Sequence, residues 1–108
     1  MKTFFCKLIA PRPSFAHDMS EEEAKLMQEH AVYWKACMDK GQVVAFGLVA
    51  DAVAPYGIAI VEVDDDADVH RLTADDPVIK AKRGFKFEIA PMPRGAVHPP
   101  FASAVRKS

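Results

Sequence analysis

The segment Ser20–Gly41 predicts one long helix, and this helix limits how the rest of the chain can fold. Ser20 and Glu23 have the spacing of a capping box, in which each side chain accepts a hydrogen bond from the backbone N–H of the other residue. Gly41 suits the left-handed position that often follows the last turn of a helix. Apolar residues recur at steps of three and four and form one stripe: Ala24, Met27, Ala31, Trp34 and Met38.

Four shorter apolar runs predict strands at residues 2–10, 42–50, 57–63 and 84–90. The first three runs are largely apolar on both faces, which is typical of strands inside a sheet. In the fourth run, Phe85, Phe87 and Ile89 alternate with charged residues, as in a strand with one solvated face. Residues 14–19, between the first strand and the long helix, are expected to form a loop.

A shorter helix is expected between the third and fourth strands. Asp64–Asp66 supply candidates for its N-cap, and Val69 and Leu72 give it one apolar face. Asp76 and Pro77 then predict a further helical turn, with Asp76 as N-cap and Pro77 at the first helical position. The resulting order, β-α-β-β-α-β, is the ferredoxin-like arrangement of the α+β class, with a four-stranded antiparallel sheet and the first and third strands at its centre.

The second face of this predicted sheet is also apolar. Two helices can cover only one face of a four-stranded sheet, and a large exposed apolar face is unusual on a monomer. We therefore expect a homodimer in which two copies pack through the sheet face.

Composition and charge exclude several classes of protein. The chain has 108 residues and a formal net charge of -1 at pH 7, which fits one domain without a basic surface for nucleic acid or an anionic membrane. No apolar run reaches transmembrane length. Cys6 and Cys37 are interpreted as reduced, buried thiols of a cytoplasmic protein. Residues 1–92 are expected to form the domain, and the proline-rich, basic residues 93–108 a tail.

Several short motifs resemble the YCII-related (YciI-like) family over about residues 2–92. They are PRPSF before the long helix, HAVYW within it and the later DDP. The resemblance implies a ferredoxin-like protomer of a dimeric α+β barrel, with a site built on His30 and Asp76. It also implies lyase- or dehydrochlorinase-like chemistry on small substrates without a redox cofactor. Leu48 stands where the family commonly has proline after a glycine, so the pocket wall is expected to differ there.

His30 and Asp76 each have a catalytic and a structural interpretation. His30 borders the apolar stripe, and an imidazole can act as general base or acid near neutral pH. The alternative is a helix-surface histidine that is hydrogen-bonded to its surroundings. Asp76 would orient His30, or would only cap a helix; one carboxylate has enough acceptor sites for both roles. Asp75 is the alternative if the register is shifted by one residue.

Two further residues are candidates for substrate binding. Arg12 would hold an anionic group in bidentate fashion, or would be a solvated loop residue. Trp34 would line the cleft, or would belong to the core. Cys37 has no evident basic partner, so a buried thiol is favoured over a nucleophile. The other histidines lack the spacing of metal ligands, and no metal is expected: His17, His70 and His98.

Two main functions remain open from the sequence. The first is a small cofactor-independent enzyme of the lyase or isomerase type, in which His30, oriented by Asp76, moves a proton on a small organic acid or cyclic compound. The second is a non-catalytic module that binds a small ligand or a partner on the same dimeric scaffold, because a fold does not decide function. A third idea is a subunit that docks through the basic tail.

Overall fold

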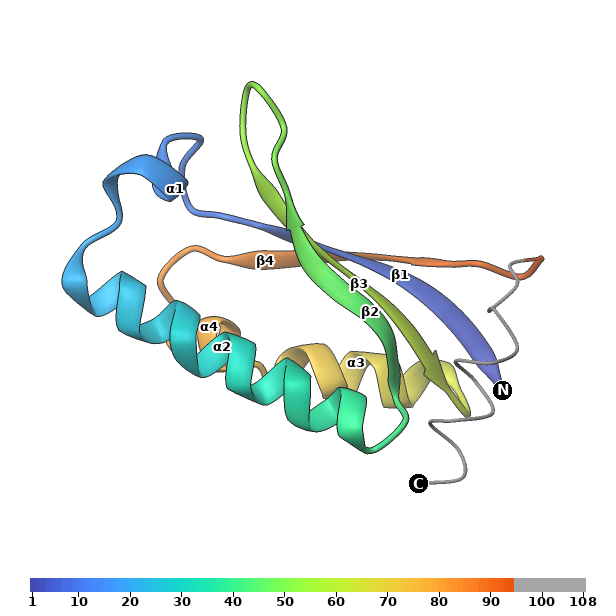
Figure 1. Cartoon of the computed structure of the whole chain (residues 1–108). Helices are drawn as coiled ribbons and strands as arrows, with labels where there is room; N and C mark the ends of the chain where they lie inside the picture. The colour runs from blue at the N-terminus through green and yellow to red at the C-terminus, as the bar shows by residue number, and fades with distance from the viewer. Residues whose placement is uncertain (95–108) are drawn as a thin grey trace.

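The computed structural model describes residues 1–94 as an α+β fold with four strands and four helices (Figure 1). In chain order these are β1 (Lys2–Ile9), α1 (Phe15–Asp18), α2 (Glu21–Asp39), β2 (Val43–Val49), β3 (Tyr56–Val63), α3 (Asp66–Ala74), α4 (Pro77–Lys80) and β4 (Lys86–Pro91). The strands form one antiparallel sheet in the order β2-β3-β1-β4. The predicted ferredoxin-like sheet, with the first and third strands at its centre, is therefore confirmed.

The predicted helix starts are made by the expected local contacts. In α2, the Ser20 hydroxyl accepts from the Glu23 backbone N–H and the Glu23 carboxylate accepts from the Ser20 backbone N–H. Gly41 follows the helix with a φ of 82°, a conformation that glycine adopts without a steric penalty. Asp65 caps α3 in a second capping box, and Asp76 caps α4, where Pro77 takes the first helical turn as predicted.

The loop prediction for residues 14–19 is wrong in part, because α1 occupies Phe15–Asp18. The backbone N–H groups of His17 and Asp18 both donate to the Ser14 carbonyl. Phe15 is buried, and its ring meets the Phe85 ring edge to face with centroids 5.1 Å apart. A helix of four residues has no apolar periodicity of its own, and Phe85, which packs against it from just before β4, lies far along the chain.

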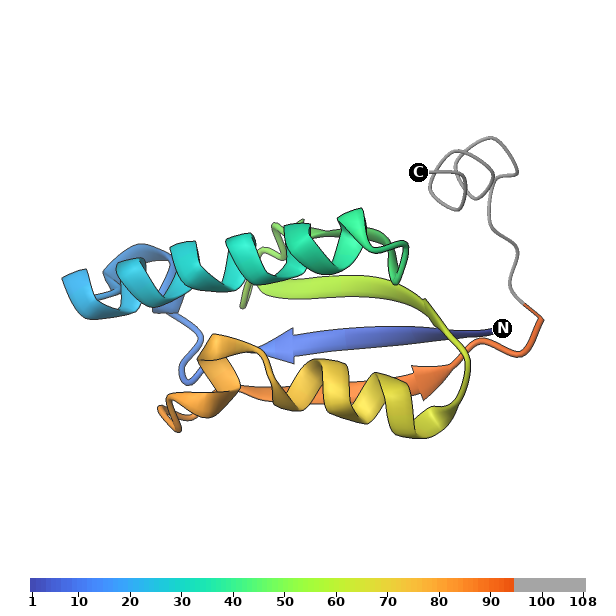
Figure 2. The same cartoon turned by 90° about the horizontal axis from the view of Figure 1, so that it is seen from below.

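The core lies between one face of the sheet and the helices α2 and α3, which run side by side beneath it (Figures 1 and 2). Along β1, alternate residues point into this core, because successive side chains of a strand point to opposite faces. The buried residues of the core come from all the layers: Phe4, Cys6, Trp34, Cys37, Val43, Ala59, Val61, Val63, Val69 and Leu72.

The opposite face of the sheet carries the other residues of the central strands. The register pairs Phe5 with Ile60 and Lys7 with Ile58, so these four side chains share that face with Ile9. All five are only partly buried. None of the helices in residues 1–94 is long and apolar enough to cross a membrane.

The predicted C-terminal tail is only partly described. The Met92 backbone N–H donates to the Thr3 carbonyl at 2.8 Å, so the chain follows β1 for one residue beyond β4. Residues 95–108 lie outside the described part of the chain, and the prediction of a tail there stays a prediction.

Candidate functional site

The Asp76 carboxylate is the centre of the candidate site and is fully buried. Its Oδ2 accepts a hydrogen bond from Trp34 Nε1 at 2.6 Å and lies 2.7 Å from His30 Nδ1. Its Oδ1 accepts from the Val78 backbone N–H at 2.9 Å. Both oxygens are therefore satisfied, which a buried carboxylate requires.

Local structure explains why these groups meet. His30 and Trp34 are four residues apart on α2 and so lie on the same side of the helix. Asp76 holds the N-cap position of α4, where its side chain normally accepts from the second or third backbone N–H of the helix. Asp75 instead takes the C-cap position of α3 and is exposed. The carboxylate that meets His30 is therefore that of Asp76, and the alternative register with Asp75 is excluded.

The hydrogen bond to Asp76 determines which nitrogen of His30 can react. With Asp76 as a carboxylate, Nδ1 carries the hydrogen and donates to Oδ2, so Nε2 of the neutral ring carries the free lone pair. Nε2 has no hydrogen-bond partner within residues 1–94, and the His30 side chain stays 16% exposed. His30 lies in the wall of a cavity, where this nitrogen can meet a ligand.

This cavity has a volume of about 300 Å³ and lies between α1, α2 and the sheet. Leu48 lines it from β2 and is 68% exposed, so the cavity is open at this edge. The ring of Trp34 forms part of the wall and lies near three other rings, with centroid distances of 6.3 Å to His30, 5.8 Å to Tyr33 and 5.8 Å to Phe87. Most other lining side chains are apolar and come from both layers: Leu8, Phe15, Ala16, Met19, Met27, Ala31, Phe46 and Phe85.

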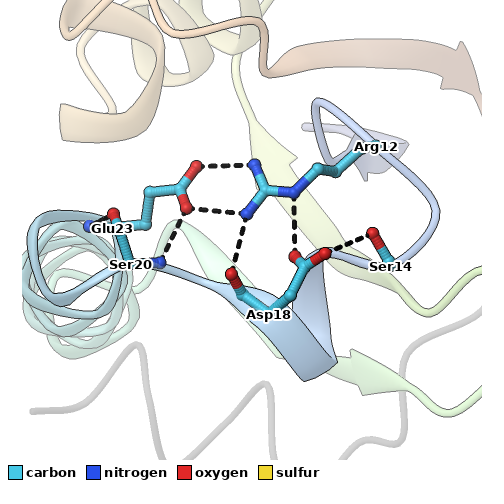
Figure 3. A network of polar contacts seen from close by, with 5 residues as sticks. All are labelled: Arg12, Ser14, Asp18, Ser20 and Glu23. Atoms are coloured by element: carbon cyan, nitrogen blue, oxygen red, sulfur yellow. Dashed lines mark hydrogen bonds and ion pairs between the residues drawn. The ribbon is translucent and has the colours of Figure 1, made fainter.

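Arg12 lies in an ion-pair network beside the cavity (Figure 3). Its Nη1 and Nη2 donate to the two oxygens of Glu23 at 2.9 and 2.8 Å, and its Nε donates to Asp18 Oδ1 at 2.8 Å. Nη2 also donates to the Asp18 carbonyl, and the Ser14 hydroxyl donates to Asp18 Oδ2. The network therefore ties the residues around α1 to the first turn of α2.

The ion pairs stabilise the charged forms of their members. The hydrogen bond from Arg12, followed by that from the Ser20 backbone, lowers the pKa of Glu23 from 4.5 to about 2. The Ser14 hydroxyl and then Arg12 lower the pKa of Asp18. The two carboxylates in turn raise the pKa of Arg12. Arg12 remains charged, and its charge is balanced within the network.

The structure brings three of the four predicted site residues together: His30, Asp76 and Trp34. Arg12 is not among the residues that line the cavity, and its donors face Glu23 and Asp18. Sequence reasoning missed the aromatic wall formed by Phe15, Phe46 and Phe87, because rings on separate elements share no sequence spacing. In the sequence, only the alternation of Phe85 and Phe87 with charged residues indicated that one face of the fourth strand packs against the helices.

The cysteines form no part of the polar site. Burial raises the pKa of the Cys37 thiol and raises that of Cys6 to about 12, so both are held as thiols at neutral pH. Both are free and buried, as predicted. Within residues 1–94, no three His, Cys, Asp or Glu residues lie close enough together to hold a metal ion.

The fold and the site define a small ferredoxin-like α+β protein with an apolar cavity and a histidine–aspartate pair in its wall. The family model described as the YCII-related domain matches residues 3–93, and the chain belongs to this family. A comparison with curated proteins found no match.

The Asp76–His30 hydrogen bond predicts the tautomer of His30. We expect the neutral ring to carry its hydrogen on Nδ1 in the wild type and to lose this preference in Asp76→Asn, because an amide oxygen is a weaker acceptor than a carboxylate. Two-bond ¹H–¹⁵N correlation spectra at alkaline pH measure the tautomer. Asp75→Asn is the matched control and should leave the spectrum of His30 unchanged. An unchanged Nδ1–H tautomer in Asp76→Asn would contradict the assignment.

The Arg12–Glu23 pair predicts how stability depends on pH. Because folding lowers the pKa of Glu23, the ionised group stabilises the fold above about pH 4.5, and this contribution is lost as pH falls toward about 2. Urea unfolding should therefore show that Arg12→Gln is less stable than the wild type at neutral pH and that the difference shrinks in this acidic range. Glu29→Gln, an exposed change on α2, is the control. A difference that is constant with pH would rule out this linkage.

Proposed function

We infer that this chain is a small cofactor-independent enzyme that transfers a proton on a small organic molecule, as lyases and isomerases do. The observation that carries the proposal is the position of His30. Its Nδ1 is held 2.7 Å from a fully buried carboxylate, and its ring borders a cavity of about 300 Å³. A histidine that is oriented through one nitrogen presents the other to a ligand as base or acid.

The proposed reaction needs only His30 and the substrate. In an isomerisation, Nε2 takes a proton from carbon, and the electron pair of that C–H bond moves into the adjacent π system. The imidazolium then returns the proton to another atom of the same molecule, so no oxidant or reductant is needed. In an elimination, the same electron pair forms a C=C bond while the leaving group departs with its bonding electrons, and the imidazolium then gives its proton to the departed group. The Asp76 carboxylate stabilises the imidazolium that forms in either case.

Asp76 and Trp34 are assigned positioning and binding roles. Asp76 does not border the cavity, so it acts through His30. Trp34 donates to Asp76 with its indole N–H and offers its ring to the substrate. Binding of an anionic substrate by Arg12 stays a prediction; it would require Arg12 to exchange a bond to Glu23 or Asp18 for the substrate.

A second candidate function is binding without turnover. The cavity wall has few polar side chains, and catalysis often uses a second polar group to stabilise developing charge. A module that only binds an apolar ligand would need no such group. The two functions differ in whether a bound carbon acid exchanges its protons.

Loss of the imidazole should abolish proton transfer while leaving the fold intact. We expect His30→Ala to slow wild-type turnover by roughly 100- to 10,000-fold, because that is the usual contribution of a general acid–base group. The measurement is deuterium incorporation from D₂O into a panel of cyclic ketones and lactones, followed by mass spectrometry. This readout detects proton abstraction even when no net product forms.

His70→Ala is the matched control, because His70 is an exposed histidine on α3 outside the cavity. It should exchange protons at the wild-type rate. Asp76→Asn should lower the rate with a smaller effect on binding. Compounds that bind the wild type without any exchange would favour the binding module over the enzyme.

We also propose that the chain forms a homodimer through the open face of the sheet, and that it is cytoplasmic. Phe5, Ile9, Ile58 and Ile60 supply apolar side chains on that face, with Lys7 among them, while α2 and α3 cover only the other face (Figure 1). Burial of this surface against a second copy would remove it from water. The buried free thiols of Cys6 and Cys37 support a reducing compartment.

A charge on the open face should separate the two copies. Ile60→Asp is expected to elute and scatter light as a monomer, because an unpaired carboxylate in an apolar interface costs several kcal/mol. Size-exclusion chromatography with light scattering measures the mass. Val32→Asp places the same charge on an exposed position of α2 and should keep the wild-type mass. A dimeric Ile60→Asp protein would place the interface elsewhere.

A further inference from the structure

We propose that the cavity selects neutral, largely apolar cyclic molecules, that a hydroxyl group on such a molecule donates to His30 Nε2, and that the cavity rejects organic anions. This inference rests on the proposed function, because it names the class of substrate for the same cavity. The sequence left two classes of substrate open, organic acids and cyclic compounds. The proposal keeps the neutral cyclic compounds and excludes the acids.

No side chain in the cavity wall is charged, except that the His30 ring carries a positive charge when it is protonated. None of its lining residues is Lys, Arg, Asp or Glu, and the polar side chains among them are His30, Trp34 and Tyr56. The indole N–H of Trp34 already donates to Asp76. The cavity therefore offers one oriented hydrogen-bonding ring, at His30. The Tyr56 ring, at the start of β3, lies beneath Lys7 Nζ, which is 4.4 Å from its centroid.

The charge of the His30–Asp76 pair also disfavours an anion. With Asp76 ionised, the pair carries a net charge of -1 when His30 is neutral and zero when His30 is protonated. Arg12 lies over the outer side of Phe15, with its guanidinium carbon 5.3 Å from the ring centroid, but Glu23 and Asp18 occupy its donors. Lys7 Nζ lies against Tyr56, but Lys7 does not line the cavity. A carboxylate that entered the cavity would lose its water and find no positive charge among the side chains of the wall.

The size and shape of the cavity favour a ring. An apolar cavity of roughly 150 Å³ holds one benzene molecule, and this cavity has about twice that volume, about 300 Å³. The rings of Phe15, Phe46 and Phe87 line it together with Trp34. Flat aromatic walls pack well against planar or alicyclic molecules. A substituted single ring or a fused pair of rings is the expected occupant.

Matched pairs of probes test this selection on the full chain. Acetophenone and benzoate share one ring and differ in the polar group, and 2-acetylnaphthalene and 2-naphthoate form a second, larger pair. Trp34 is the only tryptophan in the chain, so its indole N–H gives a single ¹H–¹⁵N cross-peak that reports from the cavity wall. Titrations that follow this peak give a dissociation constant for each probe.

The ketones are expected to bind, and each carboxylate to bind at least about tenfold more weakly than its ketone at neutral pH. Equal or tighter binding of the carboxylates would overturn the proposal, and so would the absence of binding by both ketones. The alcohol 1-phenylethanol can donate its hydroxyl hydrogen to His30 Nε2, so it should bind the wild type more tightly than ethylbenzene. It should lose this advantage in His30→Leu, because the variant removes the acceptor and keeps the apolar wall. A persistent advantage would contradict the assigned role of His30.

A designed cation tests whether charge is the reason for the selection. Ala31 is exposed on α2 and lines the cavity beside His30. Ala31→Lys should raise the affinity for 2-naphthoate by about tenfold, while Ala31→Gln, of similar length and helix propensity, should not. No gain in Ala31→Lys would show that charge does not exclude the carboxylate and would overturn the proposal.

These binding measurements separate the ligand class from catalysis. If the ketones bind but exchange no protons in D₂O, the ligand class stands and the proposed enzymatic function fails. If a carboxylate both binds tightly and exchanges protons, the enzymatic function stands and the ligand class fails.

Discussion

The buried carboxylate of Asp76 is the constraint on which the rest of this structure depends. A fully buried charge is costly unless hydrogen bonds replace its lost water. Trp34 and His30 from α2 and the Val78 backbone N–H from α4 provide these bonds. The long helix therefore has one favourable rotation against α4, and that rotation also turns the ring of His30 toward the cavity. Stability and the candidate chemistry rest on the same three contacts.

A second polar cluster lies beside the cavity, where Arg12 contacts the lining residue Phe15. Arg12 joins Glu23 in the first turn of α2 to Asp18 at the end of α1 (Figure 3). Glu23 also accepts from the Ser20 backbone, so one side chain completes both the capping box and the ion pair. This arrangement holds Phe15 against the sheet as part of the cavity wall. The charged members of the two clusters, Asp76, Arg12, Asp18 and Glu23, are not among the residues that line the cavity, whereas the rings of His30 and Trp34 are.

The parts of the fold that were predicted correctly depend on local chemistry. The capping boxes, the proline after Asp76 and the period of each strand involve residues close together in the chain, so their spacing is visible in the sequence. The short helix α1 was missed because it has only four residues and packs against Phe85, which lies far along the chain. The role of Arg12 also depends on tertiary contacts. A guanidinium in a loop can face solvent, a ligand or a carboxylate, and the sequence does not show which of these it meets.

The sequence by itself determined the order of the helices and strands, the N-cap position of Asp76 and the place of His30 beside an apolar stripe. Only the tertiary structure decided that His30 and Asp76, which are 46 residues apart, meet at 2.7 Å. It also decided that four aromatic residues from separate elements enclose one cavity and that Arg12 is engaged by two carboxylates. The physical reason is that side-chain spacing predicts which residues share one helix or strand face, whereas contacts between elements depend on how those faces pack together.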